Sequence, residues 1–219
     1  MRRRMGREVE RVLEAIVDGI SSGAIRPGAK LNGPELSRRL GVSRGPLREA
    51  IRRLEERQLV QCTPNAGARV VLHSAEEVIQ FFYVREALEG MAARLAARTM
   101  TDGEIADLRE IYEGEVARGR TLGGRNDFHM RIVRGAYHPR LSRMLNEDFY
   151  TLYRMWRANF EWLRNGGERS WNDHRRILEA IEQRDGELAE LMVRRHITRL
   201  REQAEENLRR MREPRLVGT

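Results

Sequence analysis

The feature that most restricts the fold of this chain is a short break between two amphipathic segments near its N-terminus. The segment "PELSRRLG" begins on Pro34, which suits the first turn of a helix, and ends on Gly41, which tolerates a left-handed closing conformation. Ser43 then follows as an N-cap, and Pro46 suits the first turn of a second helix. These signals predict two short helices joined by a tight turn.

A longer helix and a β-hairpin are expected on either side of this pair. Residues 9–20 repeat apolar side chains at helical spacing and end at a Ser-Ser-Gly run. After the second short helix, two β-rich runs, residues 59–63 and 68–72, flank "PNAG", whose Pro, Asn and Gly favour a tight reversal. The order helix, helix, tight turn, helix and hairpin predicts a winged helix-turn-helix with a two-stranded β wing.

From Ser74 onward the pattern changes to amphipathic helices separated by short breaks. Ser74 with Glu77, and Thr101 with Glu104, form capping boxes at the starts of two helices. Further helices are expected over residues 127–137, from His138-Pro139 through about Leu163, from Trp171 to about Arg184, and from Gly186 to about Arg212. The predicted fold class is therefore mainly α, with a winged helix-turn-helix over residues 1–73 and an all-α helical bundle over residues 74–219.

The positive charge is concentrated in the first third of the chain. Residues 1–72 carry 15 Lys and Arg against 8 Asp and Glu, whereas the remainder carries 26 against 25. A polyanion partner is therefore expected to meet the first region. The chain has no run near the roughly 18 apolar residues of a membrane span, and no pattern of a secretion signal. Because the single cysteine, Cys62, cannot form an internal disulfide, we expect a cytoplasmic protein with no membrane partner.

Three arginines follow one another at one-turn spacing on the second helix of the pair. The apolar face of this helix docks on the preceding helices, so Arg44, Arg48 and Arg52 are expected to point to solvent. Such a helix fits the major groove of DNA, where arginine bonds two acceptors of guanine. Ser43 and the helix N-terminal amides suit a phosphate, and Gly45 lets the backbone approach the duplex. A helix lying on a membrane would instead show a broader apolar face with aromatic side chains.

The stretch "SGAIRPGAKLNGPELSRRLGVSRGPLREAIRRLEERQLV" resembles the DNA-binding domain of the GntR superfamily of bacterial transcription regulators. The family's Pro-Gly turn and its Ser-Arg-x-Pro-x-Arg-Glu-Ala core occur here in order, and the resemblance covers residues 9–72. It implies that Arg44 and Arg48 read bases. Ser43 and Gly45 would lie against the duplex, and Gly67, at the tip of the wing, would enter the minor groove. By the habit of the family, the protein would be a repressor.

Two positions depart from the pattern of that family. Gln58 replaces the glycine usual before "LV", which mildly strains a helix end. Pro34 occupies a place where some members carry a DNA-contacting arginine, which puts one backbone contact in doubt. Neither departure changes the interpretation as a DNA-binding head.

Three histidines of the second region, His129, His174 and His196, lie on or beside apolar stripes. A lone histidine in such a place is more often a packed or surface residue. Three inward imidazoles in one small bundle, however, would be costly unless they were satisfied together. A shared divalent cation achieves this, since neutral imidazole suits zinc, nickel and related ions.

The segments "FFYVREALEGMAARLAA", "DFHMRIV" and "DHRRILEAIEQRDGELAELMVRRHI" resemble the all-helical effector domain, or FCD domain, of the FadR-type branch of the same superfamily. Many members of that branch hold a metal with one aspartate and three histidines, and the metal binds a small carboxylate effector. His129, His174 and His196 match the three histidines. The aspartate does not match: four residues before the first histidine stands Arg125, and Asp127 lies roughly 200 degrees around the helix from His129.

This departure leaves three possibilities for the helical domain. The three histidines bind a zinc or nickel ion, with water or effector in its remaining sites. Alternatively, Arg125 supplies a fixed positive charge that grips an effector carboxylate directly. In the third, the domain has lost its ligand and only dimerises. Arg85 matches an arginine that often lines the family's pocket, and its alternative role is an ion pair with Glu89 one turn on.

We therefore expect a homodimeric regulator that binds a near-palindromic double-stranded DNA operator and responds to a small organic acid. A metal-dependent hydrolase that uses the three histidines is a second hypothesis. It lacks a confidently placed general base and a nucleophile motif, and it leaves the basic head unexplained, so we expect no enzyme. An architectural DNA binder without an effector is the third hypothesis.

Overall fold

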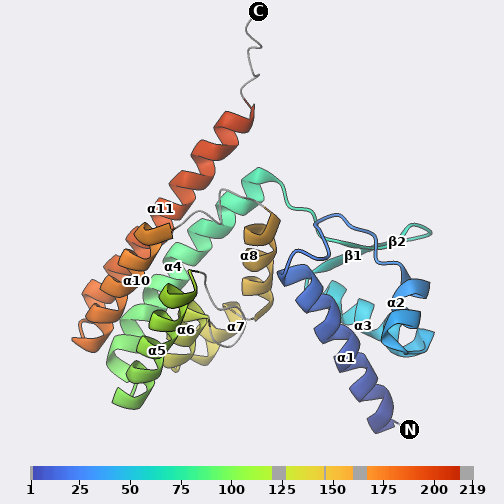
Figure 1. Cartoon of the computed structure of the whole chain (residues 1–219), viewed down its shortest axis with the longest axis horizontal. Helices are drawn as coiled ribbons and strands as arrows, with labels where there is room; N and C mark the ends of the chain where they lie inside the picture. The colour runs from blue at the N-terminus through green and yellow to red at the C-terminus, as the bar shows by residue number, and fades with distance from the viewer. Residues whose placement is uncertain (1, 120–126, 146, 160–166, 213–219) are drawn as a thin grey trace, which may run out of the picture. The chain divides into compact units, whose positions relative to one another are not determined.

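The computed structural model describes residues 2–119, 127–145, 147–159 and 167–212. Its contacts divide the chain into two compact units, Met1–His73 with Glu147–Asn159, and Ser74–Asn146 with Phe160–Thr219. Helices dominate both units, and a two-stranded antiparallel hairpin follows the N-terminal helices (Figure 1). The predicted fold class, a winged helix-turn-helix plus an all-α region, is confirmed.

The first unit begins with the predicted winged helix-turn-helix. Its elements are α1 (Arg2–Ser21), α2 (Gly33–Leu40), α3 (Arg44–Glu56), β1 (Val60–Thr63) and β2 (Gly67–Val70). The side chain of Asn32 caps α2 by accepting a hydrogen bond of 3.3 Å from the backbone N–H of Glu35. Gly41 closes α2 with φ 60°, a left-handed conformation, so the tight turn before α3 is formed as predicted.

The wing is extended by the connector that precedes α2. Strand β1 pairs antiparallel with β2, with Val60 opposite Val70. On the other side of β2, the backbone N–H of Leu31 donates to the carbonyl of Ala68 at 2.8 Å. Lys30 lies opposite Arg69 in the same pairing. The turn-rich connector therefore pairs with β2 through an isolated bridge, and it brings Lys30 to the wing.

Two polar contacts tie α1 to the two helices of the turn, one to α3 and one to α2. The guanidinium of Arg53 lies 2.8 Å from a carboxylate oxygen of Glu10. Arg11, on α1, donates to the carbonyl of Leu40 at the end of α2, at 2.7 Å. Apolar burial accompanies these contacts, because Leu54 on α3 and Ile16 on α1 are fully buried. The two helices of the turn therefore form one block with α1.

The C-terminal end of α3 adopts the geometry that usually contains a glycine. The N–H of Leu59 donates to the carbonyl of Leu54 at 3.0 Å, and the N–H of Gln58 donates to that of Glu55 at 2.9 Å. This pair of bonds places Gln58 in the left-handed region, with φ 57°. A side chain in this conformation is strained, as expected from the replacement of glycine.

The predicted single helix from His138-Pro139 through about Leu163 is wrong. The segment forms two helices, α7 (Pro139–Met144) and α8 (Glu147–Asn159), and the backbone leaves the helical conformation at Leu145, with φ −98° and ψ 49°. Helix α8 groups with the first unit, where it packs on α1. The sequence predicts a division of the chain into residues 1–73 and 74–219, and the contact grouping differs from it in the placement of α8.

The contacts of α8 explain why it belongs to the first unit. The ring of Trp156 meets that of His73 edge-on, with centroids 5.2 Å apart. Gly23, with φ 79°, lies so near α8 that a Cβ there would be 2.8 Å from the Cβ of Ala158. A larger residue than glycine at position 23 would therefore push α8 away.

The second unit is a helical bundle around α4 and α11, which run antiparallel along each other (Figure 1). Its elements are α4 (Ala75–Thr99), α5 (Asp102–Arg118), α6 (Phe128–Gly135), α7, α10 (Gly167–Glu182) and α11 (Gly186–Arg212). Both predicted capping boxes, Ser74 with Glu77 and Thr101 with Glu104, are present. Within the described ranges, no helix has the length and hydropathy needed to cross a membrane.

Candidate functional site

The N-terminal turns of α3 present an exposed cationic face. Ser43 occupies the N-cap position in an extended conformation, and its side chain makes no capping hydrogen bond. Arg44 and Arg48 are exposed, and neither makes a hydrogen bond or ion pair with any part of the chain that the structure describes. A Cβ added to Gly45 would meet no atom within 4 Å, so this face of α3 is open. The face therefore offers two cations, exposed amides and room for a close approach.

Arg52 is paired with acids of its own helix, unlike Arg44 and Arg48, with which the sequence pattern grouped it. Its Nε and Nη2 atoms donate to the carboxylate of Glu49 at 2.9 and 2.7 Å, and its Nη1 atom bonds Glu56. Hydrogen bonding to Glu49 raises the pKa of Arg52, and hydrogen bonds from Arg52 and Arg53 lower the pKa of Glu49 to about 2. Arg52 is thus engaged by the acids of its own helix, unlike Arg44 and Arg48.

A further cation, Lys30 of the connector, lies beside the tip of the wing, and the sequence patterns did not single it out. Gly67 has φ 84°, which a glycine adopts without steric cost. A Cβ at this position would lie 3.6 Å from the Cε atom of Lys30. The pairing of the connector with β2 produces this proximity, and the Pro-Gly turn before Lys30 was the only local signal.

In the second unit, three helices bring His129, His174 and His196 together. They come from α6, α10 and α11, all three are buried, and each offers a ring nitrogen within 4.8 Å of the others. The Nε2 atoms of His129 and His174 lie 3.2 Å apart. Phe128 stacks on His174 with centroids 4.5 Å apart. The sequence prediction that these three imidazoles share one interior place agrees with this geometry.

Each imidazole has a carboxylate from a different helix beside its Nδ1 atom. The distances from Nδ1 are 2.9 Å for His129 to Glu89, 3.2 Å for His196 to Asp173, and 3.8 Å for His174 to Glu115. A carboxylate at Nδ1 favours the tautomer with the proton on that atom and leaves Nε2 as a lone-pair donor. Glu89 and Asp173 therefore orient His129 and His196 for binding a cation, whereas Glu115 lies beyond hydrogen-bond distance of His174.

Arg85 is fully buried beside this cluster. Its Nε atom donates to Glu89 at 2.5 Å, so the ion pair with Glu89 is formed. Burial alone would raise the pKa of Glu89, but the charges of Arg85 and His129 hold it below its usual value. Burial would likewise raise the pKa of Asp173, but hydrogen bonds with His196 and with Arg199, whose Nε donates at 3.0 Å, hold it below its usual value. Two of the three carboxylates thus remain ionised and fixed in position.

The protonation of His196 suits a metal ligand. Burial lowers the pKa of His196 to about 4, the charges of His129 and Arg85 act in the same direction, and Asp173 opposes them. The imidazole is therefore neutral near pH 7, as cation binding requires.

The position of the missing aspartate is only partly described. Arg125 lies outside the described residues. Asp127 is the N-cap of α6 and accepts hydrogen bonds from the backbone N–H groups of His129 and Met130, at 3.0 and 3.2 Å. Its carboxylate is therefore used in starting the helix that carries His129, in agreement with its poor placement for a shared ligand.

Glu89, Glu115 and Asp173 were missed as parts of this cluster, although each left a local signal. Glu89 lies one turn from Arg85 and was considered only as its ion-pair partner. Glu115 is fully buried and follows Leu108 by seven residues, so an acidic side chain occupies a position on the apolar face of α5. Asp173 directly precedes His174 in the sequence and, on α10, reaches a histidine of another helix.

A winged helix-turn-helix head with an open cationic helix, joined in one chain to an all-helical region with a buried polar cluster, defines the class of two-domain DNA-binding regulators. Two family models match the chain, "Bacterial regulatory proteins, gntR family" over residues 8–70 and "FCD domain" over residues 80–199. The chain belongs to the GntR family and carries an FCD domain, and it is a transcriptional regulator that binds DNA. This assignment sets aside the hydrolase hypothesis, because the family and the similar proteins are regulators and not enzymes.

Similar proteins agree with this family. A probable D-xylose utilization operon transcriptional repressor of Paenarthrobacter nicotinovorans is 30% identical over 195 residues, which cover 85% of this chain and 84% of that protein. The Nta operon transcriptional regulator of Aminobacter aminovorans is 38% identical over 113 residues, which cover 49% of this chain and 54% of that protein. The solved structure of Escherichia coli McbR/YncC has the same fold, with a TM-score of 0.74 and 21% identity, over 94% of this chain and 99% of that one.

Proposed function

We propose that this regulator is a homodimeric repressor that binds a near-palindromic operator and is controlled by a small organic acid. The observation that carries the DNA-binding part is the open start of α3, where Arg44 and Arg48 have no partner within the described residues. Two such helices, related by a two-fold axis, match two half-sites of an operator. The acid changes the affinity for the operator if it binds one relative placement of the two DNA-binding heads better than another.

The geometry supports distinct roles for the residues of the head. Arg44 and Arg48 extend into the major groove and bond guanine acceptors, while Ser43 and the free N–H groups at the start of α3 bind a phosphate. Gly45 permits the close approach that these bonds require. Gly67 enters the neighbouring minor groove, with Lys30 beside it to bind a backbone phosphate. Arg52 has a smaller role than the sequence suggests, because Glu49 and Glu56 already satisfy it.

Repression is the direction that the relatives favour. The similar Paenarthrobacter nicotinovorans protein is described as a probable repressor. A protein that covers an operator blocks polymerase by occupancy alone, which requires no further contact surface.

A titration of labelled DNA from upstream of the gene tests the DNA-binding proposal. The full chain should form a sequence-selective complex at moderate salt, and a scrambled duplex of equal length should bind 10³-fold or more weakly, in line with the range of about 10³ to 10⁷ for such proteins. Equal affinity for both duplexes at every salt concentration would overturn the proposal of operator recognition.

We propose further that His129, His174 and His196 hold a divalent cation, zinc or nickel. The donor set fits such an ion, because three ring nitrogens converge in a buried place and carboxylates lie at the opposite ring atoms. When bound, the cation supplies the positive charge that an effector carboxylate needs in a buried site. Arg85 lies beside the site, where it holds Glu89 in place, and its contact with the effector stays a prediction.

Calorimetric titration of the metal-free protein with zinc tests this second proposal. One ion per chain should bind, and the melting temperature should rise with zinc and rise again with the acid that is the effector. The titration is repeated with a chelator present and with a panel of small carboxylic acids. A melting temperature that responds to acids but not to zinc would favour direct binding by Arg125. No response to either would favour an architectural DNA binder.

A further inference from the structure

Among the described residues, one pair of charged side chains joins the three buried imidazoles to solvent. Of the other charged groups beside the rings, Arg85 and Glu115 are fully buried, and the side chain of Glu89 is 3% exposed. Asp173 and Arg199 differ, because 21% and 16% of their side-chain surfaces are exposed. This ion pair between α10 and α11 is therefore the charged part of the cluster that a cation from solvent meets first.

Arg199 holds Asp173 against the ring of His196. Its Nε atom donates to the Oδ2 atom of Asp173 at 3.0 Å, and its Nη2 atom bonds the same oxygen. That oxygen lies 3.2 Å from the Nδ1 atom of His196, and the Nη2 atom of Arg199 lies 3.3 Å from the same nitrogen. A cation that approaches on this side meets the positive charge of the guanidinium, so this arrangement closes the route to the imidazoles.

The closed arrangement leaves one donor of Arg199 unsatisfied. The Nη1 atom is buried and has no hydrogen-bond partner among the described residues. A buried donor without a partner costs free energy, so the closed arrangement is less stable than the two bonds to Asp173 alone imply.

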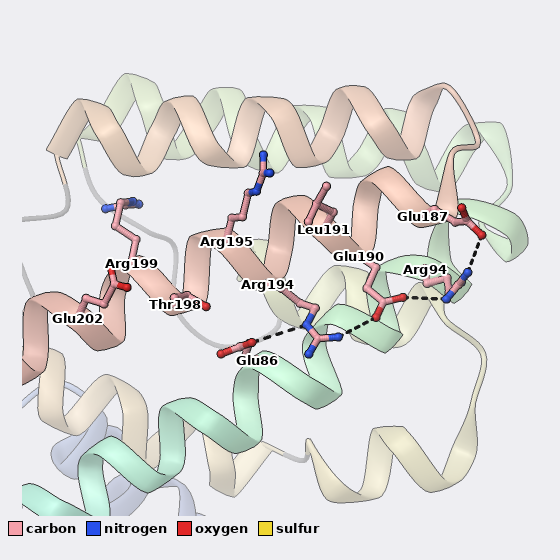
Figure 2. Close-up of a pocket in the computed structure, with 10 residues that line it drawn as sticks. All are labelled: Glu86, Arg94, Glu187, Glu190, Leu191, Arg194, Arg195, Thr198, Arg199 and Glu202. Atoms are coloured by element: carbon pink, nitrogen blue, oxygen red, sulfur yellow. Dashed lines mark hydrogen bonds and ion pairs between the residues drawn. The ribbon is translucent and has the colours of Figure 1, made fainter.

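A second acid lies within reach of Arg199 on the same helix. Glu202 follows it by three residues, a spacing at which side chains of a helix meet. Both residues line a groove of about 700 Å³, and Figure 2 shows them next to each other at one end of it. Glu202 is exposed and makes no hydrogen bond or ion pair with the residues that the structure describes. The groove therefore offers Arg199 both room and an unpaired carboxylate.

Glu202 differs in this respect from the other acids of the groove. Glu187 and Glu190 bond Arg94 at 2.8 and 3.0 Å, as dashed lines in Figure 2 show. Glu86 lies 3.6 Å from Arg194. These three acids already have partners, whereas Glu202 is free to receive Arg199.

We propose that Arg199 is a positioning residue with two acid partners, and that its movement between them controls the passage of the cation. Bound to Asp173, it holds that carboxylate on His196 and closes the route. Bound to Glu202, it leaves Asp173 free to bind an incoming cation beside His196. The first arrangement is the stable one, because its bonds are largely buried, whereas an exposed pair three residues apart on a helix contributes little. This assignment rests on the proposed cation site and adds the route by which the site is filled.

The first experiment uses the metal-free protein and measures how fast a small reagent reaches the imidazoles. Diethyl pyrocarbonate modifies accessible imidazoles, and mass spectrometry of the peptides gives the rate at each histidine. Arg199→Ala should raise the rates at His174 and His196 about tenfold or more, because the bonds to a charged group then no longer close the route. Glu202→Ala should lower them about twofold, since it removes the partner of the open arrangement. His138, which is exposed and outside the cluster, provides the reference rate in each sample.

The second experiment measures zinc uptake and release by stopped-flow mixing with a coloured chelator. Arg199→Ala should raise both rates, whereas a purely structural role of Arg199 would raise the release rate alone. Arg199→Lys keeps the charge but loses the two-bond geometry, so it should give intermediate rates. Glu202→Ala should lower both rates about twofold and leave the equilibrium affinity unchanged. The matched control is Glu206→Ala, because Glu206 is seven residues from Arg199 and already pairs with Arg210 at 2.9 Å.

The possible failures are separate from one another. Circular dichroism and melting temperatures confirm that each variant is folded. Unchanged rates in the Arg199 variants, or faster release without faster uptake, would overturn the proposal. An effect of Arg199→Ala with none of Glu202→Ala would overturn the role of Glu202. Faster modification of the imidazoles in a protein that binds no zinc would instead overturn the cation site and leave the movement of Arg199 intact.

Discussion

The start of α3 and the histidine cluster of the second unit are both rich in ionisable side chains, yet they are arranged in opposite ways. Arg44 and Arg48 are exposed and have no partner in the described residues. His129, His174 and His196 are buried, and an acid from the same unit lies beside each ring. The arginines are left open to solvent, whereas the imidazoles are enclosed with acids beside them.

This difference matches the partners proposed for the two places. A duplex brings many phosphates of its own, so cations that await it must stay open and unpaired. A small cation brings only two charges into a low-dielectric interior, so its ligands must be neutral and already oriented. Arrangement, more than residue type, therefore separates the two sites.

Removing one imidazole should have the largest effect. His196→Ala leaves two ring nitrogens, and the affinity for zinc should fall by more than about 100-fold, beyond the effect expected for groups that only orient a ligand. Zinc should then no longer raise the melting temperature. The matched control is His138→Asn, because His138 lies outside the cluster and its capping role on α7 is one that asparagine performs. Unchanged zinc affinity in His196→Ala would remove the cluster as a metal site.

Removing a carboxylate beside an imidazole should have a smaller effect on the same measurement. Asp173→Ala leaves the Nδ1 atom of His196 without its 3.2 Å partner, and zinc affinity should fall about 10- to 100-fold. Asp107→Ala provides the control, since Asp107 pairs with Arg131 on an exposed surface of α5. Equal zinc affinities in the two variants would show that the carboxylates do not orient the ligands.

Within the head, two arginines on one helix should behave differently. Arg48→Ala should weaken specific operator binding by roughly 1–3 kcal/mol and relax the preference at one base pair. Arg52→Ala should change it by about 0.5 kcal/mol or less, because Arg52 is already satisfied by Glu49 and Glu56. Titrations against the operator and against single-base variants measure both effects. A reversed order would mean that Arg52 leaves its acids when DNA binds.

The last prediction concerns the free energy of unfolding, and its substitution lies outside both the start of α3 and the histidine cluster. Gln58→Gly relieves a backbone with φ 57° and should raise the free energy of unfolding by roughly 1 kcal/mol. Gln61→Gly, in strand β1, should instead lower it by about 0.5–1 kcal/mol. Urea denaturation compares the two. A destabilised Gln58→Gly variant would mean that the side chain of Gln58 contributes more than its strained backbone costs.

Local signals in the sequence predicted what local interactions determine. The capping boxes at Ser74 and Thr101 and the left-handed closure at Gly41 involve neighbours within four residues, and all three are present. The three histidines were expected together because each lies on or beside an apolar stripe. The resemblance to the FCD domain also matches all three to the histidines of one metal site.

Features that depend on contacts between residues far apart in the sequence were missed, because no local pattern encodes them. The break at Leu145 follows no Pro or Gly, and α8 joins the first unit through contacts of Trp156 and Ala158 with distant residues. The engagement of Arg52 is local, since Glu49 and Glu56 are three and four residues away, but it depends on side-chain rotamers that the spacing alone does not determine. Glu115 reaches His174 only after α5 and α10 have packed.

The contacts that hold α3 to the remainder of the head limit how a signal could reach DNA. Arg53 on α3 bonds Glu10 of α1, and Arg11 of α1 bonds the end of α2. Because α1 is tied to both helices of the turn, α3 resists being tilted by itself. The proposed acid would thus change the spacing and angle between the two intact DNA-binding heads of a dimer. Its effect on affinity should be largest for operators with altered half-site spacing.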